Sequence, residues 1–120
     1  MHFLLLGEAS TEREALAACL GTAGHRVTSV ADASDALARI GAIRYDAVLV
    51  DLRSIDRRGD ALFATLAERD PRLASRAVIM SDADAELPRS VRRRGGRPVV
   101  RPSQPTAAIA ERLYTEARRS

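Results

Sequence analysis

The chain has 120 residues, of which 46% are hydrophobic and 29% charged, a balance typical of one folded domain and not of a disordered segment. A single cysteine, Cys19, excludes an internal disulfide framework and a cysteine-based structural zinc site. No apolar run approaches the roughly 20 residues of a membrane span. The apolar run nearest the N-terminus, Phe3 to Leu6, has no basic flank followed by a small-residue cleavage site, so it is not a signal peptide. We therefore expect a cytoplasmic protein with a single domain over residues 1–120.

All 19 basic residues are arginine, so any mechanism that requires a lysine is excluded. The net charge of +3 is modest, but it is unevenly distributed, because six arginines and no acid lie between Leu87 and Ala110.

Short apolar runs alternate with longer alanine-rich segments along the whole chain. Near-continuous hydrophobicity over a few residues is typical of strands that are buried on both faces of a parallel sheet. We predict five such strands, in chain order: Phe3–Leu6, Val27–Val30, Ala47–Val50, Ala77–Met80 and Val99–Val100.

The segments between the strands have the signals of helices. The first helix begins with a capping box of Thr11 and Glu14 and ends near Gly24. The second begins after Asp32 or Ser34, since either side chain can cap it.

Three further helices are predicted in the second half of the chain. One covers residues 59–69, and a weak one covers 83–93, where Pro88 interrupts the pattern. The last begins near Pro105 and runs toward the arginines at the end of the chain. The order is therefore β-α repeated five times, which predicts a doubly wound α/β fold with right-handed crossovers and helices on both faces of a parallel sheet.

Polar side chains follow four of the predicted strands at the points where these strands end. They are Glu8, Asp51, Ser81 and Arg101. Ligands of such sheets bind at the carboxyl ends of the strands. A carboxylate nucleophile, a second acid for a metal, a hydroxyl and a cation are the groups that phosphoryl transfer requires.

With these residues the whole chain resembles the receiver domain of bacterial two-component response regulators. Asp51 matches the aspartate that accepts the phosphoryl group, and Ser81, 30 residues further on, matches the hydroxyl position. Gly59 and Pro102 match a loop glycine and the proline of the family's Lys-Pro pair. The resemblance implies a flavodoxin-like sheet with strand order 2-1-3-4-5 and a magnesium site that includes Glu8 and Asp51.

The departures from the family's pattern concern its chemistry. The acidic pair after the first strand is Gly7-Glu8, so one acid is missing, and we expect Mg²⁺ binding to be weak or absent. The family's lysine is Arg101, whose planar fork does not replace a compact ammonium at a tight site. Three further departures are Ile55 for a proline, Asp82 for a small residue and Pro98 for an aromatic switch residue.

Each site residue also has a purely structural interpretation. Asp51 can cap or order a loop, and Ser81 can satisfy backbone groups at the end of its strand. We expect Arg101 to be a salt-bridge partner of Asp51 or Glu8, with its charge replacing that of a metal. Such interpretations make the chain a pseudo-receiver in which phosphorylation chemistry is degenerate.

An arginine-rich stretch precedes the last strand. Nucleic acid is disfavoured as its ligand, because no aromatic residues are interleaved and no nucleic-acid motif is present. A solvated face or a surface for a protein partner is the preferred interpretation. The stretch contains Arg89, Arg92, Arg93, Arg94 and Arg97.

We therefore predict an atypical receiver in bacterial signal transduction that is not an enzyme and acts mainly by protein–protein interaction. The resemblance implies docking through the fourth helix, fifth strand and fifth helix, with a histidine kinase, another signalling protein or a second copy as partner. The main alternative is a conventional Mg²⁺-dependent receiver, phosphorylated on Asp51 by a histidine kinase within a phosphorelay. A flavodoxin-like small-molecule binder is disfavoured, because no phosphate-binding glycine loop follows any strand.

Overall fold

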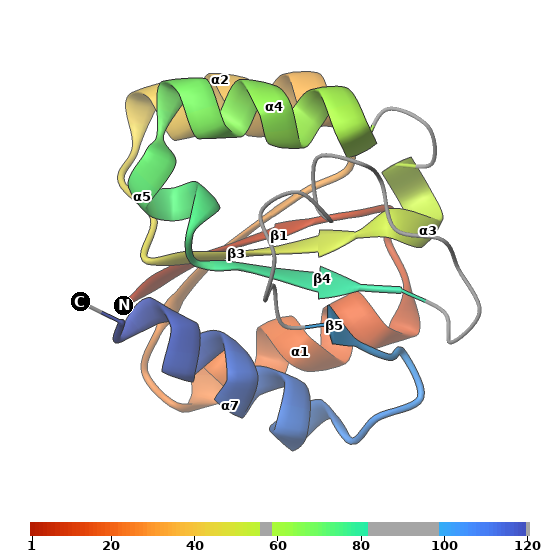
Figure 1. The fold of residues 1–120 in the computed structure, drawn as a ribbon. Helices are drawn as coiled ribbons and strands as arrows, with labels where there is room; N and C mark the ends of the chain where they lie inside the picture. Colours follow the sequence, from red (N-terminus) through yellow and green to blue (C-terminus); the bar gives the residue numbers. More distant parts are fainter. Residues whose placement is uncertain (56–58, 82–98, 120) are drawn as a thin grey trace.

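The structure, a computed structural model, describes residues 1–55, 59–81 and 99–119. Its strands form one parallel sheet in the order β2-β1-β3-β4-β5, with helices on both faces (Figure 1). The predicted fold class and strand order are therefore confirmed. The strands are β1 (His2–Leu6), β2 (Arg26–Val30), β3 (Ala47–Asp51), β4 (Ala77–Met80) and β5 (Val99–Val100).

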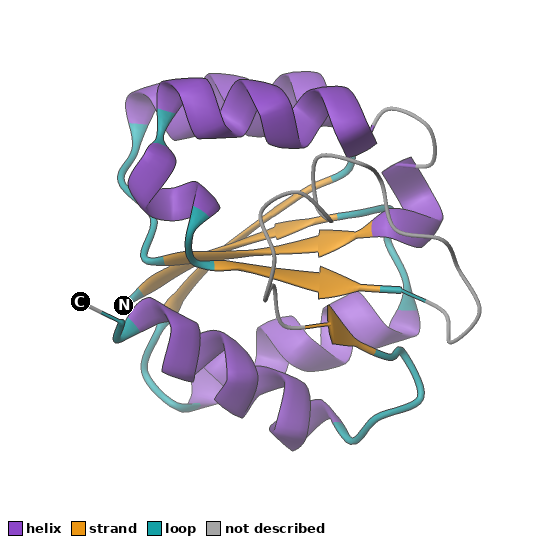
Figure 2. Ribbon diagram, viewed as in Figure 1, coloured by secondary structure: helices purple, strands orange, loops and turns teal. Residues whose placement is uncertain are grey.

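The helices form two layers that enclose the sheet (Figure 2). One layer contains α1 (Thr11–Thr22) and α7 (Thr106–Ala117). The other contains α2 (Ala33–Ala42), α4 (Gly59–Arg69) and the short α5 (Pro71–Ala74), while the single turn of α3 (Leu52–Ile55) follows β3 directly. Within the described ranges, every helix is too short or too polar to span a membrane.

Alternation along the central strands divides the core between the two layers. In β1, Leu4 and Leu6 pack with the α2 and α4 side, whereas Phe3 and Leu5 pack with α1 and α7. All residues of β1 after His2 and all residues of β3 and β4 are buried. The predicted burial on both faces is wrong for β2, where only Val30 is buried, because this strand lies at the edge of the sheet.

Capping residues explain where the first two helices begin. The N-cap of α1 is Ser10, whose hydroxyl accepts the backbone N–H of Arg13 at 3.1 Å. The predicted capping box at Thr11 is thus wrong by one residue, because Ser10 is the last extended residue and Thr11 is already helical. Asp32 caps α2, accepting the N–H of Asp35 at 2.8 Å.

The remaining sequence predictions for helices have mixed outcomes. The helix over 59–69 is confirmed as α4, and Pro71 starts the separate turn of α5. Gly24 ends the first helix region with a φ of 91°, a conformation that favours glycine. The predicted helix over 83–93 lies outside the described residues, as does the arginine-rich stretch.

Candidate functional site

The carboxyl ends of four strands lie along one edge of the sheet. Leu6 pairs with Val50, and Asp51 pairs with Met80. Met80 in turn pairs with Val100. The register therefore places Gly7, Asp51, Ser81 and Arg101 at neighbouring strand ends.

Asp51 is buried at this edge and has several hydrogen bonds. It is 4% exposed, and both of its carboxylate oxygens accept hydrogen bonds from Arg53. The Nε of Arg53 donates to Oδ1 at 3.0 Å, and Nη2 donates to Oδ2 at 2.9 Å. A bidentate pair of this kind is charge-assisted and fixes both the position and the orientation of the carboxylate.

The carboxylate of Asp51 also orders the chain that follows β3. Its Oδ1 accepts the backbone N–H of Arg53 at 3.0 Å, so that Asp51 caps the single turn of α3. This contact is the loop-ordering role that the sequence left open for Asp51. It also brings the Arg53 side chain back over the strand end.

Arg53 extends the interaction to helix α1. Its Nη1 donates to Oε1 of Glu12 at 3.0 Å, so all three guanidinium nitrogens are bonded to carboxylates. We call Asp51, Arg53 and Glu12 the Arg53 network. It connects the end of β3 to the first turn of α1, although Arg53 and Glu12 are 41 residues apart in the sequence.

The hydrogen bonds of the network favour the charged forms of Arg53 and Glu12. The hydrogen bonds with Asp51 raise the pKa of the Arg53 guanidinium, outweighing the opposite effect of burial. A backbone hydrogen bond at Glu12, followed by the hydrogen bond from Arg53, lowers the pKa of the Glu12 carboxyl below its usual value. Glu12 and Arg53 are therefore charged throughout the neutral pH range.

Gly7 allows a close approach of β1 to Asp51. A Cβ atom built on Gly7 would lie 2.8 Å from the Cβ of Asp51, a distance that real Cβ atoms essentially never show. An acid at position 7, where the receiver pattern has one, would therefore require Asp51 to move.

The other predicted site residues have different surroundings. Ser81 is 2% exposed, and its backbone N–H donates to the carbonyl of Val100 at 3.0 Å. Glu8 lies on the exposed stretch between β1 and α1. Arg101 is exposed, and its backbone N–H donates to the side chain of Gln104 at 2.7 Å.

The expected ion pair of Arg101 with Asp51 or Glu8 is wrong. Among the described residues, no salt bridge joins Arg101 to either carboxylate, and Arg53 occupies the oxygens of Asp51 instead. The physical reason is local, since Arg53 is two residues from Asp51 on the turn that Asp51 itself caps. Arg101 belongs to the far edge of the sheet beyond β5.

In this structure the carboxylate that a magnesium ion would need is occupied by Arg53. Mg²⁺ requires oxygen ligands in near-octahedral geometry, and both oxygens of Asp51 are bonded to Arg53. Position 7 supplies no carboxylate and has no space for one beside Asp51. In the part of the chain that the structure describes, no group of three histidine, cysteine or acidic residues is arranged to hold a metal.

Sequence reasoning missed Arg53 and Glu12. The available signal was the position of Arg53, two residues after Asp51, which allows its backbone and its side chain to reach the same carboxylate. No sequence signal indicated that Glu12, on a different helix, would complete the network.

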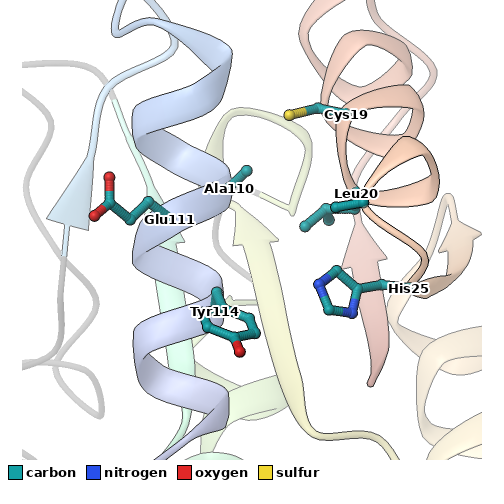
Figure 3. A pocket seen from close by; sticks show the side chains of 7 residues that line it. Cys19, Leu20, His25, Ala110, Glu111 and Tyr114 are labelled. Carbon is teal, nitrogen blue, oxygen red and sulfur yellow. The ribbon is translucent and has the colours of Figure 1, made fainter.

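A separate cavity of about 270 Å³ lies between α1 and α7, away from the strand ends (Figure 3). The rings of His25 and Tyr114 face each other there with their centroids 5.6 Å apart. Tyr114 is 37% exposed at the edge of this cavity. Its lining comprises Cys19, Leu20, Ala23, His25, Ala110, Glu111 and Tyr114.

No protein-family model and no curated protein matches the sequence. Solved structures do match it over nearly its whole length. The receiver domain of NtrX from Brucella abortus is 23% identical, with a TM-score of 0.82 and coverage of 98% of this chain and 99% of that chain. The receiver domain of the sensor histidine kinase PA1611 from Pseudomonas aeruginosa, whose active-site cleft coordinates a magnesium ion, is 21% identical, with a TM-score of 0.76 and coverage of 97% and 96%.

A longer NtrX chain from Brucella abortus, in complex with ADP, is also similar to this chain. It is 24% identical with a TM-score of 0.77, and it matches 97% of this chain. The chain spans only 26% of the length of that protein. At these identities the likeness concerns the architecture, and this chain has the fold of a response-regulator receiver domain.

Proposed function

We propose that this chain is an atypical receiver domain of a two-component signalling system that acts by protein–protein contact, with a degenerate phosphorylation site at Asp51. It works as a binding module and not as an enzyme. Its partner is a histidine kinase or another signalling protein.

The observation that carries this proposal is the bidentate pair between Arg53 and Asp51. An aspartate that accepts a phosphoryl group must present a free carboxylate oxygen to the phosphorus atom. Here Oδ1 accepts two hydrogen bonds and Oδ2 accepts one, all from Arg53. The loss of an acid at Gly7 further reduces the capacity for Mg²⁺, which phosphoryl transfer uses to neutralise developing charge.

The exposed residues of β5 and α7 leave room for a protein partner on the surface that the resemblance implies for docking. Val99 of β5 is 46% exposed, and one face of α7 is buried while the opposite face meets solvent. A surface made of an edge strand and a neighbouring helix suits a protein partner or a second copy of the chain. The third part of this surface, the helix predicted over residues 83–93, lies outside the described residues.

A calorimetric titration with Mg²⁺ and beryllofluoride, a phosphoryl mimic, tests the proposal on the intact chain. We expect no saturable heat for either reagent at millimolar concentration. Tight stoichiometric binding of both would overturn the proposal and favour a working phosphorylation site.

A genetic test examines the same proposal in cells. Asp51→Asn should leave the signalling output intact, whereas Arg92→Ala combined with Arg93→Ala should impair it by altering the docking surface. The reverse pattern would replace the degenerate receiver with a phosphorylated one.

A conventional receiver is the second candidate function. It is supported by the placement of Asp51 and Ser81 at the ends of adjacent strands, both buried and in register. In that case a histidine kinase phosphorylates Asp51, and Mg²⁺ binding requires Arg53 to leave the carboxylate first.

A further inference from the structure

We propose that Arg53 is the resident cation of this site, an intramolecular inhibitor that occupies Asp51 and keeps it from binding a divalent cation. This inference extends the proposed function, because it assigns the degeneracy of the site to one removable side chain. It also assigns to Glu12 the role of second carboxylate at the site.

The geometry of the guanidinium supports this assignment. Arg53 presents Nε and Nη2 to the two oxygens of Asp51, and Nη1 to Oε1 of Glu12, at 2.9 to 3.0 Å. A planar fork of donors matches a carboxylate in a way that a point charge does not. The single guanidinium therefore occupies the carboxylate oxygens of Asp51 and Glu12, which would otherwise be the residues to hold a divalent cation.

The two carboxylates reach the same cation from different elements. Asp51 belongs to the end of β3, and Glu12 belongs to the first turn of α1. Both carboxylates are therefore bonded to one guanidinium, Asp51 through Nε and Nη2 and Glu12 through Nη1. Glu12 thus supplies from α1 a negative charge that Gly7 does not supply from β1.

Burial makes the exchange of Arg53 for a free cation unfavourable. The side chain of Asp51 is 6% exposed and that of Arg53 is 29% exposed, so the pair is only partly screened by solvent. A divalent cation approaching Asp51 would meet the positive charge of Arg53 at hydrogen-bond distance from the same oxygens. Removing that charge while keeping the side-chain volume should expose Asp51 and Glu12 together.

The test compares Mg²⁺ binding by the wild-type chain and Arg53→Met, which keeps an apolar stem of similar length. We expect no saturable binding of Mg²⁺ by the wild type. We expect saturable binding by Arg53→Met, with an affinity at least on the order of tenfold above the upper limit that the wild-type titration sets. Arg53→Ala serves as a second variant, and the circular dichroism spectrum of each establishes that it is folded.

Two control variants separate a site effect from a general change of charge. Arg39→Met removes an arginine from a surface salt bridge with Asp35 on α2, so it lowers the net charge equally and should leave Mg²⁺ binding unchanged. Adding Glu12→Gln to Arg53→Met should lower the gained affinity, because one of the two carboxylates is lost.

The outcomes distinguish this inference from the proposed function. If the wild type does not bind Mg²⁺ and the folded Arg53 variants do not bind it either, the inference is wrong and the degenerate receiver stands. If Arg39→Met gains as much affinity as Arg53→Met, the inference is also wrong, because the effect is then one of net charge. Tight binding by the wild type itself would overturn the proposed function as well.

Discussion

Replacing Gly7 with alanine tests how closely β1 approaches Asp51. The added Cβ would lie 2.8 Å from the Cβ of Asp51 and 3.4 Å from its Oδ2. The first contact is with an atom fixed to the backbone of the buried strand β3, so it cannot be relieved by rotating a side chain. Either β1 or the end of β3 must move.

The expected cost follows from this distance. Carbon atoms prefer separations of roughly 3.5 to 4.0 Å, and overpacking a rigid core costs about 1–3 kcal/mol. Alanine also restricts the unfolded chain, which stabilises the folded state by about 0.4–1 kcal/mol where the conformation is compatible. We therefore expect Gly7→Ala to lower the free energy of unfolding by roughly 1–2 kcal/mol, which corresponds to a fall of about 4–8 °C in Tm at roughly 4 °C per kcal/mol.

Thermal denaturation followed by circular dichroism measures this effect, with Gly21→Ala as the matched control. Gly21 lies in α1, and a Cβ there would meet nothing within 4 Å. The same chemical change should therefore raise the free energy of unfolding by about 0.5–1 kcal/mol at that position. The two substitutions should shift Tm in opposite directions.

A double-mutant cycle with Asp51→Gly identifies the contact responsible. Asp51→Gly removes the Cβ that the new methyl group would meet, so Gly7→Ala should cost less in that background than in the wild type. An unchanged cost would show that the strain arises elsewhere. A Gly7→Ala variant as stable as Gly21→Ala would refute the close approach itself.

Three further substitutions have expected effects on stability, each measured by thermal or urea denaturation. Burial, then the charge of Arg26, lowers the pKa of His2 below 6.5. As the pH falls, the unfolded state therefore binds a proton at His2 before the folded state does. The free energy of unfolding should decrease as the pH drops from about 6.5 through the folded-state pKa, and His2→Gln should make this decrease smaller. Tyr45→Phe should leave the stability unchanged or raise it, since the buried hydroxyl has no hydrogen-bond partner among the described residues; a loss above roughly 1 kcal/mol would contradict this. Asp32→Ala should cost about 1 kcal/mol by removing the cap of α2, and equal stability of variant and wild type would count against that role.

Periodicity and composition were sufficient to predict the sheet and most of its helices. The apolar runs coincide with the strands because parallel strands between two helical layers need apolar side chains on both faces. The prediction of β2 as a doubly buried strand was wrong, because β2 lies at the edge of the sheet, as the strand order implied by the resemblance already indicated. The turns of α3 and α5 were missed because each is a four-residue turn, too short to have a periodic pattern.

The site was predictable in position but not in its contacts. The predicted strands place Asp51 and Ser81 at strand ends, and the resemblance implies the strand order that makes these ends neighbours. Which cation pairs with Asp51 depends on backbone conformation beyond the strand. Asp51 caps α3, and that cap orients Arg53 toward the carboxylate, whereas Arg101 leaves its strand in another direction.

Gly7 and Arg53 are two features of this site whose effects on the charge around Asp51 are connected. Glycine at position 7 removes a negative charge and allows β1 to approach Asp51 closely. With that acid gone, a monovalent guanidinium balances much of the charge that remains on Asp51 and Glu12. Arg53 supplies this guanidinium from the chain itself, two residues from Asp51, whereas the binding of a free cation depends on its concentration. Restoring an acid at position 7 alone would therefore not restore a metal site, because Arg53 would still hold both oxygens of Asp51 and the new side chain would collide with its Cβ.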